Sequence, residues 1–186
     1  TVNDSKSVDF IKAVVAQRSI KTMEEIIEIE SALEVTYEMQ TQAMRLSGPG
    51  RFEREVAGII EGIALTRGNP VSYPVIFTVN GQTLHNNFHG NEMQAGDIVI
   101  NDSGAESDLH YASDITRTFP VSGRFTAEQR DIYNIVLQTN MKSIEAVKPG
   151  VPFKDIHINA AKIITLGLKD LGIMQGSVDD AVEQGA

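Results

Sequence analysis

Residues 96–120 read GDIVINDSGAESDLHYASDITRTFP, and this stretch decides the fold that the sequence predicts. Residues 97–102 and residues 111–119 are rich in β-branched and aromatic side chains, which is typical of strands. The separation between Asp102 and Asp114 is even, so a hairpin of these strands places both carboxylates on the same face of the sheet. The stretch therefore predicts two antiparallel strands with two acidic side chains close together.

Two helices are predicted before these strands. Thr22 and Glu25 form a capping box, and the helix that they begin ends near Ser47. The residues on its apolar face are Met23, Ile26, Leu33, Tyr37 and Met44. A second amphipathic helix begins near Arg51 and ends before Gly68. We expect these two helices to form an antiparallel pair.

A further strand over residues 73–79 precedes a turn at Asn80. After the strands, a second capping box begins a helix at Thr126 that ends near Lys148, and another helix follows and ends near Gly172. Helices, strands and helices in this order favour an α+β fold with an antiparallel sheet covered by helices. An alternating βαβ arrangement does not fit this order.

The two ends of the chain carry weaker patterns. Residues 1–18 are interpreted as a linker that leads into the fold, and residues 175–186, which are small and polar, as a weakly structured end. The length is that of one domain with its own core. We therefore predict a single domain over residues 1–186.

The composition excludes several classes of protein. The net charge of -9 argues against a nucleic-acid-binding protein, because that function depends on clustered Lys and Arg. The chain has no cysteine, so it forms neither disulfides nor a thiolate zinc site. Residues 1–6 are polar and no apolar run reaches about 18 residues, which predicts a cytoplasmic chain without a membrane segment.

Asp102 and Asp114 are candidate metal ligands. Like charges that face each other on a sheet are destabilising unless a cation lies between them. Hard ions such as Mn²⁺ and Mg²⁺ accept carboxylate oxygen, and carboxylates bridge the ions of two-metal sites. The alternative is that the aspartates form turns or pair with an arginine. Arg117 is interpreted as an ion-pair or structural residue.

Four segments match one known family in order. They are residues 18–26 (RSIKTMEEI), Leu84–His85, residues 96–106 and, above all, residues 111–123. With these segments, nearly the whole chain from Ser19 onward resembles part of the catalytic domain of the aminopeptidase P and prolidase group, relatives of methionine aminopeptidase and creatinase. The resemblance implies the first part of a pita-bread fold and an enzyme that removes the N-terminal residue before proline.

The resemblance also implies roles for single residues. Asp102 and Asp114 correspond to metal ligands, and His85 corresponds to a histidine that lies beside the substrate and stabilises the transition state. Two divalent ions are implied, with Mn²⁺ preferred and Zn²⁺ or Co²⁺ as alternatives. The remaining ligands, one His and two Glu, are expected beyond Ala186. We therefore expect the chain alone to be inactive, and the intact protein to be a homo-oligomer, as a dimer.

Two departures from the family pattern and three rival hypotheses remain. The segment between Asp102 and Asp114 is one residue longer than in the commonest motif, and Asn86 stands where an aromatic residue often follows the histidine. The other histidines are interpreted as exposed or structural residues; they are His89, His110 and His157. The rivals are a prolidase-type dipeptidase, a peptidase-like binding module without catalysis, and creatinase-like hydrolysis without metal. The paired aspartates weigh against the last two.

Overall fold

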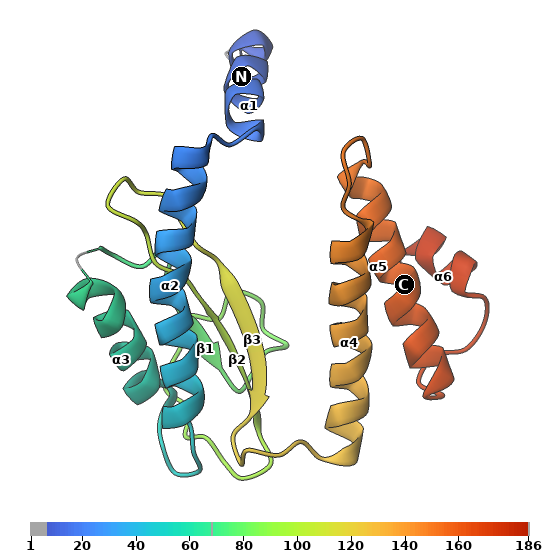
Figure 1. Cartoon of the computed structure of the whole chain (residues 1–186). Helices are drawn as coiled ribbons and strands as arrows, with labels where there is room; N and C mark the ends of the chain where they lie inside the picture. The colour runs from blue at the N-terminus through green and yellow to red at the C-terminus, as the bar shows by residue number, and fades with distance from the viewer. Residues whose placement is uncertain (1–6, 68, 186) are drawn as a thin grey trace, which may run out of the picture. The chain divides into compact units, whose positions relative to one another are not determined.

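The computed structural model describes residues 7–67 and 69–185 (Figure 1). Within these residues it contains six helices and a three-stranded antiparallel sheet with the order β1-β2-β3. The chain divides into two compact units, of which the first ends at Arg124 and the second begins at Phe125. The prediction of an α+β fold with an antiparallel sheet is confirmed, whereas a single domain over residues 1–186 stays a prediction.

The sheet consists of β1 (Ile76–Thr78), β2 (Ile98–Ser103) and β3 (Ile115–Pro120). β2 lies within one residue of its predicted bounds, but β3 begins later than the predicted strand at 111–119. Before β3, residues 111–114 are joined to the segment after β2 by an isolated bridge between Glu106 and Ala112 and by hydrogen bonds between Ser113 and Ala105. A Cβ atom on Gly104 would lie 1.9 Å from the carbonyl oxygen of Ser113, so glycine is required where these segments approach.

Helices α2 (Met23–Leu46) and α3 (Glu53–Thr66) both pack on the sheet, as Figure 1 shows. The predicted capping box begins α2, because Thr22 Oγ1 accepts from the Glu25 backbone N–H at 3.3 Å and Glu25 Oε2 accepts from the Thr22 N–H at 2.7 Å. Helix α2 ends at Leu46, one residue before the predicted end, so the prediction of both helices is confirmed.

The predicted apolar face of α2 is wrong. Met23 and Tyr37 are 67% and 72% exposed, although both were placed on that face. The residues that α2 buries are Ala32, Thr36, Met39, Gln40 and Ala43. Most of these are small or polar, and they allow the helix to approach the strands closely and to form hydrogen bonds with them. Large apolar side chains were therefore a poor guide to the face of α2 that packs on the sheet.

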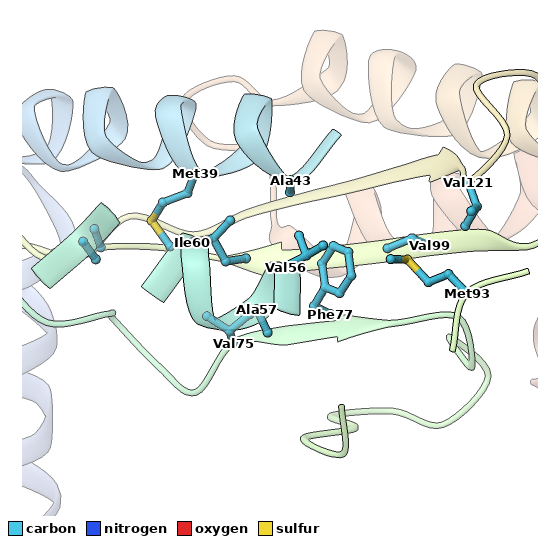
Figure 2. Packing of buried hydrophobic residues seen from close by; sticks show 12 residues of the cluster. Met39, Ala43, Val56, Ala57, Ile60, Val75, Phe77, Met93, Val99 and Val121 are labelled. Carbon is cyan, nitrogen blue, oxygen red and sulfur yellow. The ribbon is translucent and has the colours of Figure 1, made fainter. Parts of the chain in front are cut away.

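The hydrophobic core of the first unit lies between these helices and the sheet (Figure 2). Its buried members are Met39, Ala43, Val56, Ala57, Ile60, Ala64, Val75, Phe77, Met93, Val99, Ala105 and Val121. Phe77 on β1 and Val99 on β2 extend toward the helices from adjacent strands (Figure 2). Burial of a side chain of this size contributes about 1.5 to 3 kcal/mol, so the core fixes which face of each strand points inward.

The second unit consists of α4 (Ala127–Ala146), α5 (Phe153–Asp170) and α6 (Val178–Gln184). The predicted capping box begins α4, because Thr126 and Gln129 exchange hydrogen bonds of 3.0 and 3.2 Å. Helix α5 ends before Gly172, whose φ of 74° is left-handed as expected of a residue after a helix. At Gly167, an added Cβ atom would lie 2.7 Å from Ile135, so α5 packs closely on α4.

The ends of the chain contain helices that the sequence patterns did not indicate. Helix α1 (Val8–Ser19) begins with a hydrogen bond of 3.2 Å from the Phe10 N–H to Ser7 Oγ and buries none of its residues. Helix α6 lies within residues 175–186, where Ser177 caps it and Gly185 ends it; the weak structure expected of this end as a whole stays a prediction. Caps define the start of both helices, and α6 also packs on α5 with Val178, Ala181 and Val182 half-buried. Residues 1–6 lie outside the described part, and the linker role of residues 1–18 stays a prediction.

None of the helices in the described ranges is long and apolar enough to cross a membrane.

Candidate metal centre

The two candidate ligands lie at the same end of the β2–β3 pair. Along β2, Asn101 and Ser103 are buried, whereas Asp102 between them points to the other face because side chains alternate. Asp102 pairs with Thr116, and Asp114 precedes Thr116 by two residues, so the two aspartates are diagonal neighbours on one face. The structure thus brings together the pair that the even spacing indicated.

Tyr73 joins the two carboxylates. Its hydroxyl lies 2.6 Å from Oδ1 of Asp102 and 2.8 Å from Oδ1 of Asp114. Burial and the hydrogen bonds to both aspartates raise the pKa of Tyr73 far above its ordinary value, so the phenol keeps its proton and donates. A hydroxyl has only one hydrogen, and the two carboxylates therefore share a single donor. Their other oxygens keep free acceptor capacity toward a cation.

Sequence patterns indicated no role for Tyr73 beyond strand formation. The residue comes three positions before β1, and its approach to Asp102 follows from the register in which Ile76 pairs with Asp102. A partner across an antiparallel pair is fixed only when the register is known. The signal that could have pointed to Tyr73 is a hydroxyl-bearing residue at the start of the strand that precedes the acidic pair.

A buried polar network under Asp102 ties the strands to α2. Gln40 Nε2 donates to the carbonyl oxygen of Ile115 at 2.6 Å and to Ser103 Oγ at 3.3 Å. Asn101 Nδ2 donates to Gln40 Oε1 at 2.9 Å. Asn101 and Ser103 flank Asp102 in the sequence but point to the opposite face, and Ile115 follows Asp114. The bonds therefore hold the backbone from which the aspartates project.

A second network holds the chain beside Asp114. Ser113 Oγ lies 2.6 Å from Thr36 Oγ1 and donates to the carbonyl oxygen of Ala105 at 2.8 Å. The Ala105 N–H in turn donates to Ser113 Oγ at 3.0 Å. Ser113 is 2% exposed, so each of these polar atoms needs its partner within the protein. Helix α2 therefore fixes both sides of the acidic pair.

A cavity of about 320 Å³ opens onto the carboxylates. Its lining residues are Tyr73, Pro74, Ile76, His85, Asn87, Asp102 and Asp114. His85 reaches the cavity from the loop after the predicted turn, in which the Thr83 N–H donates to the carbonyl oxygen of Asn80 at 2.9 Å. The backbone of His85 has a φ of 52°, an unusual value for a residue with a side chain. The histidine and the acidic pair thus line one cavity.

The remaining candidates have other partners. His89 Nδ1 donates to the carbonyl oxygen of Phe77 at 3.1 Å, and His110 Nδ1 pairs with Glu106 at 2.6 Å. Arg117 donates to the Thr116 carbonyl at 2.8 Å, and among the described residues it forms no ion pair with either aspartate. His157 lies on α5 in the second unit. The alternative in which an arginine pairs with the aspartates therefore has no support from Arg117 among the described residues.

The geometry places a cluster of oxygen donors at the end of an antiparallel sheet. Two carboxylates and a phenol on one face offer the hard oxygen atoms that Mn²⁺ and Mg²⁺ prefer. Over residues 7–67 and 69–185, no group of three or more His, Cys, Asp or Glu residues could hold a metal ion. The residues present therefore fit part of a metal-ligand set.

The chain belongs to metallopeptidase family M24, whose model matches residues 28–180. The Xaa-Pro aminopeptidase of Escherichia coli strain K12 is 38% identical to it over 184 residues. That match covers 96% of this chain and 41% of the Escherichia coli protein. The chain is thus a homologue of Xaa-Pro aminopeptidases and spans less than half the length of this relative.

Solved structures of Escherichia coli aminopeptidase P show the same arrangement. A variant of that enzyme in complex with substrate matches with a TM-score of 0.86 at 38% identity, over 91% of this chain and 39% of that one. A zinc-substituted form in complex with product matches with a TM-score of 0.85 over the same shares of the two chains, also at 38% identity. The expected pita-bread fold is therefore confirmed for the part that this chain contains.

Proposed function

We propose that Asp102 and Asp114 are metal ligands in an Xaa-Pro aminopeptidase, and that this chain forms part of that enzyme's active site. The observation that carries the proposal is the shared hydrogen bonding of both carboxylates by one phenol on the wall of a cavity. Membership of a metallopeptidase family supports it. The ions proposed are two divalent cations, Mn²⁺ by preference with Zn²⁺ or Co²⁺ as alternatives. A zinc-substituted relative is compatible with that range.

Each residue of the proposed site has its own role. Asp102 and Asp114 hold the cations with the oxygens that Tyr73 leaves free, and Tyr73 fixes the orientation of both carboxylates. When bound, the cations supply an activated water and polarise the scissile carbonyl group. His85 donates a hydrogen bond to the oxygen of that carbonyl group from the wall of the same cavity. Negative charge that develops on the oxygen strengthens this bond.

The substrate proposed is a peptide with proline at the second position. The support is homology to Xaa-Pro aminopeptidases and to an Escherichia coli relative solved with substrate. A prolidase-type dipeptidase and a binding module without catalysis stay as alternative hypotheses. The binding module predicts that the chain binds a Gly-Pro peptide without metal, which an NMR titration in the presence of EDTA would detect. Cytoplasmic location and dimer formation also stay predictions.

Metal binding by the purified chain tests the proposed ligands. Two carboxylates are expected to bind Mn²⁺ weakly, and electron paramagnetic resonance of the free ion measures the bound fraction. Asp102→Asn and Asp114→Asn should each abolish this binding, whereas Asp108→Asn, on the neighbouring loop, should leave it unchanged. Equal binding by all four proteins would contradict the proposal. The chain is also expected to leave Gly-Pro peptides intact, and hydrolysis would contradict the incomplete ligand set.

A chimera tests the activity. In it, the chain replaces the matching segment of the Escherichia coli enzyme, with which it shares 38% identity. We expect the chimera to release the N-terminal residue of Xaa-Pro peptides when Mn²⁺ is present, and His85→Ala to lower kcat more than it raises KM. A folded chimera that binds Mn²⁺ but cleaves no Xaa-Pro peptide would exclude the proposed specificity for this segment.

A further inference from the structure

Glu53, the first residue of α3, has a fully buried carboxylate. Its Oε1 atom accepts from the Val79 backbone N–H at 2.8 Å, Thr78 Oγ1 at 3.2 Å and Asn91 Nδ2 at 3.1 Å. Its Oε2 atom accepts from the Asn91 backbone N–H at 3.3 Å and from Asn91 Nδ2 at 3.0 Å. No ion pair with Glu53 occurs in the part of the chain that the structure describes. Neutral donors and the start of a helix therefore stabilise its charge.

These donors belong to the two ends of one loop. Val79 directly follows β1, and Asn91 lies where the chain returns to α3. At the returning end, the Glu53 N–H also donates to the carbonyl oxygen of Asn91 at 3.0 Å, and the Arg54 N–H donates to that of His89 at 3.0 Å. A single carboxylate thus closes the loop of residues 79–91, and His85 lies within that loop.

A second path connects Glu53 to the neighbour of His85. Thr78 Oγ1 donates to Glu53 and accepts from Asn86 Nδ2 at 3.3 Å. Thr78 is 1% exposed, so its hydroxyl has no alternative partner in water. Because His85 has a left-handed backbone, its ring direction depends on how the neighbouring residues are held.

We propose that Glu53 is a positioning residue that directs His85 over the carboxylate pair by closing the loop of residues 79–91. This inference rests on the proposed role of His85 in the active site. The negative charge is essential, because every hydrogen-bond partner of the Glu53 carboxylate is a donor. A glutamine would place an amide N–H against the donors of Asn91 and leave buried polar atoms unpaired.

NMR of the purified chain tests the inference, with Mn²⁺ as a paramagnetic probe at the carboxylate pair. The variants are Glu53→Gln and Thr78→Val, and Glu55→Gln is the matched control, an exposed glutamate in the same helical turn. In the wild type and the control, Mn²⁺ should broaden the ring signals of His85 together with the backbone amide of Asp114. In both variants the Asp114 signal should still broaden, whereas broadening of the His85 ring should be reduced relative to that of Asp114.

Hydrogen exchange separates the two paths. In Glu53→Gln, exchange of the Val79 amide should accelerate about tenfold or more, because its bond to a charged acceptor is lost. In Thr78→Val, the Val79 amide should stay protected while His85 is released. Undiminished broadening of His85 in Glu53→Gln, despite faster exchange of Val79, would overturn the inference and leave Glu53 a purely structural role.

Two further outcomes also decide the question. If Glu53→Gln does not fold, Thr78→Val decides, and retained broadening of His85 in that variant overturns the inference. If Mn²⁺ broadens no aspartate signal in the wild type, the proposed metal ligands fail but Glu53 remains testable. The backbone amide shift of His85 must then change in Glu53→Gln and not in Glu55→Gln. An unchanged shift would reject the positioning role.

Discussion

The base of the 79–91 loop and the end of the β2–β3 pair both contain carboxylates, but the two regions supply very different numbers of hydrogen-bond donors. Glu53 is fully buried and accepts five hydrogen bonds. Over residues 7–67 and 69–185, Asp102 and Asp114 share the hydroxyl of Tyr73 as their one side-chain donor. A carboxylate whose acceptor positions are filled holds the structure together, whereas a pair with too few donors keeps its attraction for a cation. The number of donors, more than burial, separates the two roles.

The largest change in stability is expected at Glu53, whose carboxylate has all its acceptor positions filled. Glu53→Gln should lower the free energy of unfolding of the first unit by about 3 kcal/mol, because a buried amide then faces donors that have lost their acceptor. Urea titration followed by the amide signals of β2 measures this change. Glu55→Gln should change stability by less than about 0.5 kcal/mol. If Glu53→Gln lowered the free energy of unfolding by less than about 1 kcal/mol, the hydrogen bonds to the Glu53 carboxylate would not stabilise this region.

The second effect concerns cation binding at the pair with few donors. Asp114→Asn should weaken Mn²⁺ binding at least about tenfold, which corresponds to about 1.4 kcal/mol. Glu53→Gln, if folded, should leave the affinity within about twofold, because Glu53 has no free acceptor position. Water-proton relaxation reports the bound fraction of Mn²⁺. Equal losses of affinity in the two variants would remove the distinction between the regions.

The third effect has the opposite sign to the first. In buffer with EDTA, Asp102→Asn should raise the free energy of unfolding by about 0.5 to 1 kcal/mol, because it removes one of two like charges on neighbouring strands. The asparagine amide can also donate to Asp114. The same urea titration measures the change, and Asp108→Asn on the adjacent loop serves as control. Destabilisation by Asp102→Asn would show that repulsion in the pair is already relieved without a cation.

The smallest effect is a change of stability with pH. Burial and the two aspartates raise the pKa of Tyr73 in the folded chain above the value of about 10 expected when the chain is unfolded. The stability from this group is therefore fully present below pH 10 and is lost as the pH rises above 10. Tyr73→Phe should have a flatter stability curve above pH 10 than the wild type. Tyr111, whose pKa is raised by its hydrogen bond to Glu25, is present in both proteins and contributes equally to both stability curves. Parallel curves for the wild type and Tyr73→Phe above pH 10 would therefore contradict the role of Tyr73.

The part of the site that the sequence predicted depends on local pattern. The even separation of Asp102 and Asp114 was enough to place them on one face, because side-chain direction alternates along a strand regardless of the rest of the fold. Capping boxes located the start of α2 and α4 for the same reason, since their partners lie only three residues apart. Assignments of this kind need no knowledge of long-range contacts.

The part that the sequence did not predict depends on partners far apart in the chain. Glu53 reads as an acidic residue in the first turn of a helix, a position that is usually exposed, and only the returning loop buries it. Tyr73 becomes part of the site through the register of β1 with β2. The packed face of α2 was missed because, outside the helix itself, Thr36 and Gln40 find their partners on β2 and β3 and in the segment between them.

Those contacts of α2 also set an order of events during synthesis of the chain. Thr36 and Gln40 bind Ser113 and Ile115, which lie 77 and 75 residues later in the chain. At a synthesis rate of about 5 to 20 residues per second, these partners are made roughly 4 to 15 s after Thr36 and Gln40. During that time the polar side chains of Thr36 and Gln40 lack these partners. A chaperone that binds α2 during translation would protect the nascent chain until both aspartates have been made.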